Sequence, residues 1–120
     1  MPQQSNAVTG AAIKQAIEGR DGVRLASFYT DDALMRIIDR NNPPSKPHEV
    51  KGKAAISRHW EDICGRAITH KIETSITEGN RIAFTQACAY PDGAKVFSQA
   101  MVELRDGKIS QHTLVQAWDE

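Results

Sequence analysis

The sequence has 120 residues, the length of one domain, and its 40% hydrophobic and 25% charged residues are typical of a globular protein. Its 15 Lys and Arg balance 15 Asp and Glu, and a net charge of zero disfavours a nucleic-acid-binding module, which usually carries a basic face. No apolar run reaches the ~20 residues of a membrane span, and the polar N-terminus does not resemble a secretory signal. We therefore expect a cytoplasmic protein with neither nucleic acid nor membrane as a partner.

The first half of the chain carries helical patterns and shows no linker, so we expect a single domain over residues 7–120 after a flexible segment of residues 1–6. Apolar residues at three- and four-residue spacing predict three helices. Their expected ranges are 7–19, with Ser5 or Asn6 as the N-cap, 21–29, with Asp21 as the N-cap, and 52–64. The side chains expected to hold these helices to the sheet are Ile13, Ile17, Leu25, Phe28, Ile56, Trp60, Ile63, Ile72 and Ile82.

Between the second and third helices we expect one strand and one long loop. Thr30–Asp32 lacks an apolar period and is interpreted as a turn, and the strand follows over residues 33–38. Three prolines within residues 40–49 exclude regular structure there. This loop is either a lid or rim over a site, or a solvated connector.

The second half of the chain changes to a period of two, which is typical of half-buried strands. Four strands are expected over residues 68–78, 81–90, 95–105 and 108–118, separated by turns that contain Gly. In the first of them, Ile68, Ile72 and Ile76 are expected to share the buried face. Helices followed by an antiparallel run of strands indicate the α+β class.

One face of this sheet is expected to carry small and apolar side chains. Over residues 81–90 the even positions are large and the odd positions are small. The residues expected on the outer face are Ala83, Thr85, Ala87 and Ala89, extended by Phe97, Met101 and Val115. Because small side chains let another sheet approach closely, we expect a homodimer formed through the outer sheet face.

Three short motifs follow one another along the chain. They are FYTDDA at residues 28–33, GKAAI at 52–56 and DGKI at 106–109. In this order, over nearly the whole chain, the sequence resembles the SnoaL-like proteins of the nuclear-transport-factor-2-like superfamily. The resemblance implies a cystatin-like cone, in which three N-terminal helices pack in a curved, mostly antiparallel β-sheet with a pocket at its wide end. Because the family includes both enzymes and non-catalytic binding proteins, the function depends on the site.

The positions that match ketosteroid isomerases of this family lack the catalytic groups. By resemblance, the catalytic aspartate falls at Ile37, the oxyanion tyrosine at Ile13 and the protonated aspartate near Ala100. None of these side chains can donate or accept a hydrogen bond, so we expect no isomerase activity on ketosteroids. The polyketide-cyclase pattern places its histidine at His112, whereas its aspartate falls at Leu114.

The same resemblance turns one face of the last strand inward and implies a mainly apolar pocket for a small apolar ligand. The residues expected to line it are Tyr29, Met35, Ile37, Trp60, Phe84, Gln86, Cys88, Tyr90, Ser98, Gln116 and Trp118. Two further residues are catalytic candidates: His112, whose imidazole ordinarily titrates near ~6.5, and Asp39 at the pocket mouth. Alternatively, the apolar members form the core, a neighbour satisfies His112, and Asp39 ends its strand in solvent.

The remaining chemistry-bearing residues are interpreted as structural. His59 and His70 are expected in the core or at its rim, Cys64 and Cys88 to stay reduced, and Cys88 to act as a small apolar filler. The histidine spacing indicates no metal site.

Two functions stay open. One is isomerase, cyclase, dehydratase or hydrolase chemistry on a small apolar oxygenated molecule, without a cofactor. The other is a non-catalytic binding or dimeric interaction module. A carboxylate within hydrogen-bond reach of His112 would favour the enzyme, because acid/base chemistry there needs two titratable groups.

Overall fold

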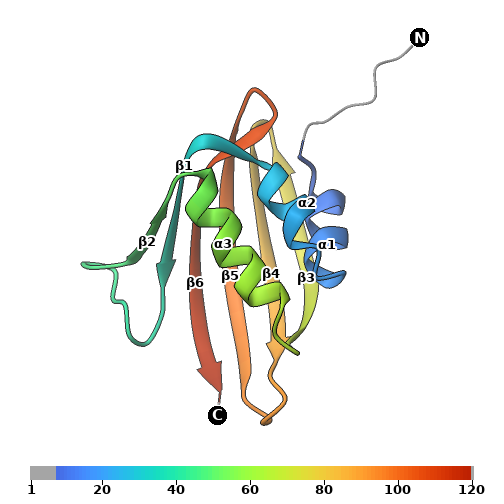
Figure 1. Ribbon diagram of the computed structural model, residues 1–120, viewed down its shortest axis with the longest axis vertical. Coiled ribbons are helices and arrows are strands. Elements are labelled where there is room, and N and C mark those ends of the chain that lie inside the picture. The colour runs from blue at the N-terminus through green and yellow to red at the C-terminus, as the bar shows by residue number, and fades with distance from the viewer. Residues whose placement is uncertain (1–7, 120) are drawn as a thin grey trace.

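The computed structural model describes residues 8–119; the segment expected to be flexible, with Ser5 and Asn6, lies outside them. Over these residues the chain forms three helices and six strands, and the helices lie against one face of a single sheet (Figure 1). The helices are α1 (Gly10–Glu18), α2 (Gly22–Ser27) and α3 (Lys53–Cys64). The strands are β1 (Tyr29–Ile38), β2 (His48–Lys51), β3 (Thr69–Glu78), β4 (Arg81–Ala89), β5 (Lys95–Arg105) and β6 (Lys108–Asp119).

Local signals explain where the helices begin. The Thr9 hydroxyl accepts a hydrogen bond from Ala12 N at 3.0 Å, so Thr9 is the N-cap of α1, and the expectation that this helix begins at residue 7 with Ser5 or Asn6 as its cap was wrong. The Asp21 carboxylate, as expected, accepts a hydrogen bond from Arg24 N at 3.1 Å. Gly52 precedes α3 with a φ of 88°, a conformation that favours glycine. Its N–H donates to the Ala33 carbonyl at 2.8 Å, which ties the start of α3 to β1.

The sheet order is β2-β1-β6-β5-β4-β3. All neighbouring pairs are antiparallel except β1 and β6, which are parallel. This pair places the first strand of the chain beside the last, so that Met35 lies opposite His112. In the same strand pair Tyr29, the first residue of β1, lies opposite Ile109 near the start of β6.

The region around β1 differs from the sequence-based expectation at three points. Tyr29 opens β1 instead of ending the second helix. Thr30–Asp32 belongs to β1 and is not a turn, and the pairing with β6 shifts register just there, which explains the missing apolar period. Residues 48–51 form β2, antiparallel to β1, so the long loop is shorter than expected.

Strand β3 carries a bulge that moves Ile76 out of the core. Ile72 pairs with Gln86 but Thr74 pairs with Thr85, so Glu73 is an extra residue. One extra residue turns every later side chain to the opposite face. Ile72 is therefore buried, whereas Ile76 is 66% exposed, and the expectation that both share the buried face was wrong.

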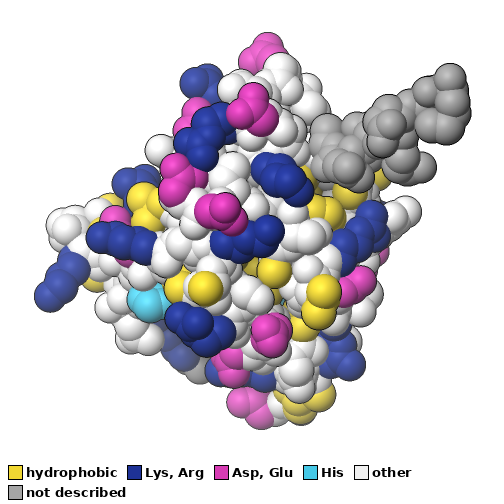
Figure 2. All heavy atoms as spheres, turned by 45° about the horizontal axis from the view of Figure 1, so that its top comes forward, with side chains coloured by type: hydrophobic (Ala, Val, Ile, Leu, Met, Phe, Trp, Pro, Cys, Tyr) yellow, Lys and Arg dark blue, Asp and Glu magenta, His cyan; other side chains and the backbone are white. Residues whose placement is uncertain are grey.

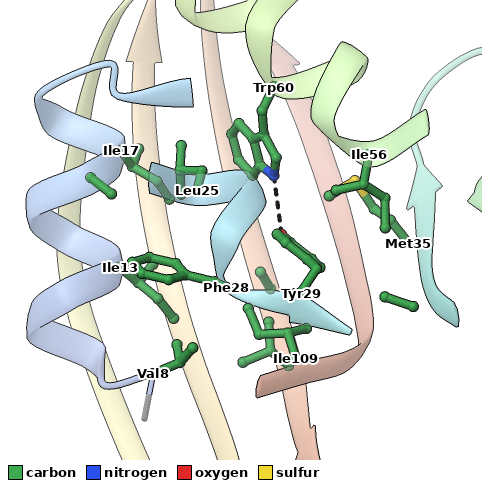
Figure 3. Close-up of a cluster of buried hydrophobic side chains, with 14 of the residues drawn as sticks. Val8, Ile13, Ile17, Leu25, Phe28, Tyr29, Met35, Ile56, Trp60 and Ile109 are labelled. Atoms are coloured by element: carbon green, nitrogen blue, oxygen red, sulfur yellow. Dashed lines mark hydrogen bonds between the residues drawn. The ribbon is translucent and has the colours of Figure 1, made fainter. Parts of the chain in front are cut away.

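The core lies between the helices and the sheet (Figure 3). Of the residues expected there, Ile63 is partly buried and the others are buried: Ile13, Ile17, Leu25, Phe28, Ile56, Trp60, Ile72 and Ile82. Tyr29 points up from β1 toward the Trp60 ring, and Trp60 Nε1 donates a hydrogen bond to the Tyr29 oxygen at 3.1 Å (Figure 3). The core therefore contains a polar contact directly beneath α3.

The surface mixes both signs of charge, and Figure 2 shows Lys and Arg interspersed with Asp and Glu over one face. This distribution agrees with the zero net charge of the sequence. None of the helices over residues 8–119 is long and apolar enough to span a membrane.

Candidate functional site

A cavity of about 70 Å³ lies between α3 and the inner sides of β4, β5 and β6. An engineered apolar cavity that binds benzene has about 150 Å³, roughly twice this volume. Because the cavity is not fully enclosed, a small ring can enter it in part and extend toward its opening.

Most of the residues expected in a pocket lie at this cavity. They are Ile37, Trp60, Phe84, Gln86, Cys88, Tyr90, Ser98, His112 and Gln116. Period-two alternation on β4 and β6 brings them together, because every second side chain faces the helices. No Asp, Glu, Lys or Arg lines the cavity among the described residues.

Four other expected residues lie elsewhere. Tyr29 and Met35 are buried in the core beside the cavity. Trp118 packs on Tyr90, with ring centroids 5.5 Å apart. The Asp39 carboxylate accepts hydrogen bonds from Asn41 N and Asn42 Nδ2, both at 2.9 Å, and so closes the turn after β1.

His112 takes part in a buried hydrogen-bond chain. The Tyr29 oxygen accepts from Trp60 Nε1, so its own hydrogen needs another acceptor. His112 Nδ1, 2.8 Å away, is the acceptor that this hydroxyl reaches within residues 8–119. Tyr29 therefore donates to Nδ1, and the ring proton of the neutral imidazole sits on Nε2. That nitrogen is buried and has no hydrogen-bond partner in the described part of the chain.

Burial determines the charge state of this chain of residues. It lowers the pKa of His112 to about 3, with a smaller contribution from His59, and it raises the pKa of Tyr29 well above its usual value. His112 is therefore neutral at pH 7, in contrast to the titration near neutral pH that an exposed imidazole shows. Among the described residues its hydrogen-bond partner is a tyrosine and not a carboxylate.

Two further histidines line the cavity, although the sequence suggested only a core or rim position for them. His59 projects from α3 and His70 from β3. Burial lowers the pKa of both imidazoles, so they are neutral at pH 7. The sequence indicated the inward position of His70, because His70 and the buried Ile72 are two residues apart on one strand and so share a face. The position of His59 at the cavity depends on how α3 packs against the sheet.

His70 belongs to a small polar cluster on β3 and β4. Its Nδ1 lies 3.0 Å from Gln86 Nε2 and 3.2 Å from the Cys88 sulfur. Gln86 Nε2 also donates to that sulfur at 3.0 Å. Cys88 is thus a polar member of the cavity wall and not merely an apolar filler, and burial raises the pKa of its thiol. Within residues 8–119, no three His, Cys, Asp or Glu side chains converge to hold a metal ion.

Comparison with known proteins finds the same fold in several solved structures. A nuclear-transport-factor-2-like protein of unknown function from Mesorhizobium loti is 16% identical, with a TM-score of 0.76 over 88% of this chain and 84% of that chain. A candidate ketosteroid isomerase from Kribbella flavida is 17% identical, with a TM-score of 0.72 over 92% of this chain and 74% of that chain. A bacterial protein with a cystatin-like fold from Silicibacter pomeroyi is 14% identical, with a TM-score of 0.73 over 95% of this chain and 77% of that chain.

At these identities the structures share a fold with this chain, and their names say nothing about its reaction. They confirm the expected cystatin-like α+β architecture. No curated protein matches the sequence. The profile of the SnoaL-like domain, however, matches residues 11–112, which is most of the chain. The chain therefore belongs to the SnoaL-like domain family of the nuclear-transport-factor-2-like superfamily.

Proposed function

We propose that this protein binds a small, uncharged, mainly apolar molecule in the cavity, and that His112 donates a hydrogen bond to an oxygen of that molecule. The observation that carries the proposal is the buried His112 Nε2, which has no partner among the described residues. Leaving a buried donor unpaired costs about 1–3 kcal/mol. A ligand oxygen that accepts from this N–H recovers that free energy on binding.

The lining of the cavity supports an uncharged ligand. Burial keeps His59, His70 and His112 neutral at pH 7, and no described Asp, Glu, Lys or Arg lines the cavity. Transferring an ion from water into such surroundings is costly without a paired opposite charge. An apolar ring with a carbonyl, ether or ester oxygen meets the same surroundings at little cost.

Titration with cyclohexanone, with cyclohexane as the reference, tests this proposal. We expect the ketone to shift the ¹⁵N and ¹H signals of the His112 ring and to bind about 3- to 10-fold more tightly than the hydrocarbon, the gain of one hydrogen bond. His112→Phe removes the donor and is expected to abolish that preference. His48→Phe, on exposed β2, is the matched control. Equal affinity for the two compounds in the wild type, or an unmoved His112 signal, contradicts the proposal.

Cofactor-free acid/base chemistry of the isomerase, cyclase, dehydratase or hydrolase type is a second candidate, and the position of His59 favours it. A neutral imidazole can polarise a carbonyl group by donating to its oxygen. His59 lines the same cavity and is neutral, so it can accept a proton. In such a step His59 removes a proton from the carbon beside the carbonyl, and His112 Nε2–H stabilises the resulting enolate oxygen.

Hydrogen exchange separates the two candidates. In D₂O, an enzyme of this kind exchanges the hydrogens beside the carbonyl of cyclohexanone faster than buffer does, and His112→Phe, which removes the donor, slows that exchange by about 10²–10³-fold. The non-catalytic binding module leaves the exchange at the buffer rate and still binds the ketone. The measurement is ¹H NMR of the ketone.

A further inference from the structure

The cavity holds a second unpaired donor position besides His112. Among the described side chains, two buried polar atoms have no hydrogen-bond partner, and they are the Nε2 atoms of His70 and His112. Both rings line the same cavity. Native proteins pair most buried polar groups, so two unpaired nitrogens at one cavity point to a ligand that supplies both partners.

The neighbours of His70 determine which of its nitrogens carries the proton. Gln86 Nε2 is an amide nitrogen, which can only donate, and it lies 3.0 Å from His70 Nδ1. His70 Nδ1 must therefore accept, and the Cys88 thiol, 3.2 Å away, contacts the same atom. The proton of the neutral His70 ring consequently sits on Nε2, as it does in His112. Both unpaired nitrogens are N–H donors.

The two donors stand on well-separated strands. His70 lies on β3 and His112 on β6, with β4 and β5 between them in the sheet. At about 4.8 Å per interval, three strand intervals separate the backbones of β3 and β6 by roughly 14 Å along the sheet. A ligand that pairs both of them carries acceptors at its opposite ends.

We propose that His70 and His112 act as a pair of N–H donors, and that the ligand is a small ring with two acceptor oxygens at opposite ends, such as a cyclic diketone or a keto-lactone. This proposal rests on the proposed binding function and adds the second anchor. A molecule with one acceptor leaves one donor unpaired, and a site built for hydrogen bonds rejects such an analogue. A ligand that presents only a hydroxyl hydrogen at one end places a donor against the N–H of His70 or His112, and its binding is disfavoured.

The first test needs no ligand. Long-range ¹⁵N–¹H correlation of the histidine rings in the wild-type protein distinguishes the two neutral tautomers. We expect both His70 and His112 to be protonated on Nε2. A proton on Nδ1 of His70 overturns the donor pair and leaves the proposed role of His112 intact.

The second test compares 1,4-cyclohexanedione with cyclohexanone, which has the same ring and a single acceptor. We expect the dione to bind the wild type about 3- to 10-fold more tightly, which is the gain from one additional hydrogen bond, and to shift the signals of the His70 and His112 rings. His70→Phe removes the second donor and is expected to bring the affinity ratio to about one. His70→Gln, whose amide can donate, restores part of the ratio, and His48→Phe leaves it as in the wild type.

The outcomes separate this inference from the function on which it rests. If cyclohexanone shifts His112 but the dione binds no more tightly, the second anchor is wrong and the binding function stands. If neither compound shifts either ring, both proposals fail. Circular dichroism shows whether each variant folds. If His70→Phe does not fold, the tautomer of His70 in the wild type tests the donor pair by itself.

Discussion

At the scale of single residues, the hydroxyl of Tyr29 determines what His112 can do. The hydroxyl accepts a hydrogen bond from Trp60 Nε1 and donates one to His112 Nδ1. The His112 imidazole therefore carries its proton on Nε2 and presents an N–H donor there. Burial removes the competing charged form by lowering the pKa of His112 to about 3. The result is a neutral donor in apolar surroundings, where a hydrogen bond to a ligand oxygen does not compete with bulk water.

The lowered pKa of His112 predicts that acid destabilises the fold through this side chain. Between pH 6.5 and about 3 the unfolded chain binds a proton on His112 that the folded chain does not, so the free energy of unfolding falls as the pH falls. The loss attributable to His112 is about 2 kcal/mol between pH 7 and pH 5. Urea unfolding at both pH values measures it against His112→Gln, which lacks this proton. Equal losses in the two proteins would contradict the prediction.

Residue identity also predicts that ketosteroid isomerisation is absent. Ile13 is buried in the core, while Ile37 and Ala100 line the cavity, and none of them can remove a proton or bind an oxyanion. A volume of about 70 Å³ encloses only part of one ring, so four fused rings do not fit within the cavity. We expect conversion of a 5-ene to a 4-ene 3-ketosteroid at the uncatalysed rate, measured by the absorbance of the product. Conversion above that rate would also refute the assignment of Ile13, Ile37 and Ala100 to the catalytic positions of the isomerase.

At the scale of elements, one extra residue in β3 divides the strand into an inner and an outer part. The Ile72 N–H, beside the bulge, donates to the Glu18 carboxylate at 2.9 Å, and the Lys14 ammonium holds that carboxylate at 2.8 Å. Helix α1 thereby supplies a hydrogen-bond partner where the strand ladder is irregular. The bulge and the helix that packs on it therefore support each other.

This division predicts opposite outcomes for two isoleucines of β3. Ile72→Ala creates a cavity in the core and is expected to lower the free energy of unfolding by about 2–5 kcal/mol. Ile76→Ala removes the same atoms from an exposed position, and we expect a change within about 0.5 kcal/mol. Chemical denaturation of the two variants makes the comparison. Similar losses for both would mean that β3 pairs without the bulge.

At the scale of the whole molecule, the outer face of the sheet predicts self-association. Phe97, Met101 and Val115 are 47%, 52% and 49% exposed on β5 and β6. Large apolar side chains gathered on an exposed sheet face are a common mark of an interface. We propose that a second copy of this chain covers them, in a homodimer through the outer sheet face.

Sedimentation at micromolar concentration tests this association. We expect the mass of a dimer for the wild type and of a monomer for Met101→Glu, because an unpaired carboxylate at the centre of the interface is costly to bury. Val23→Glu adds the same charge to an exposed apolar position of α2 and is expected to remain dimeric. A monomer mass for the wild type would refute the proposal.

The sequence by itself determined the features that depend on neighbours along the chain. Apolar spacing located the helices around Ile13, Leu25 and Trp60, and alternation located the four strands of the second half of the chain. The inward orientation of His112 came from the family resemblance. The ordered motifs identified the family. These signals are local, because helix and strand periods follow from backbone geometry within a few residues.

Only the tertiary structure decided the rest, because it depends on contacts between distant residues. The parallel pairing of β1 with β6 brings Tyr29 to His112 across 83 positions, and no spacing in the sequence predicts that hydrogen bond. The pKa of His112 follows from its burial in the folded chain, where its ring packs against Tyr29 of β1 and Phe84 of β4. For the same reason the convergence of His59, His70 and His112 on one cavity is a property of the folded chain.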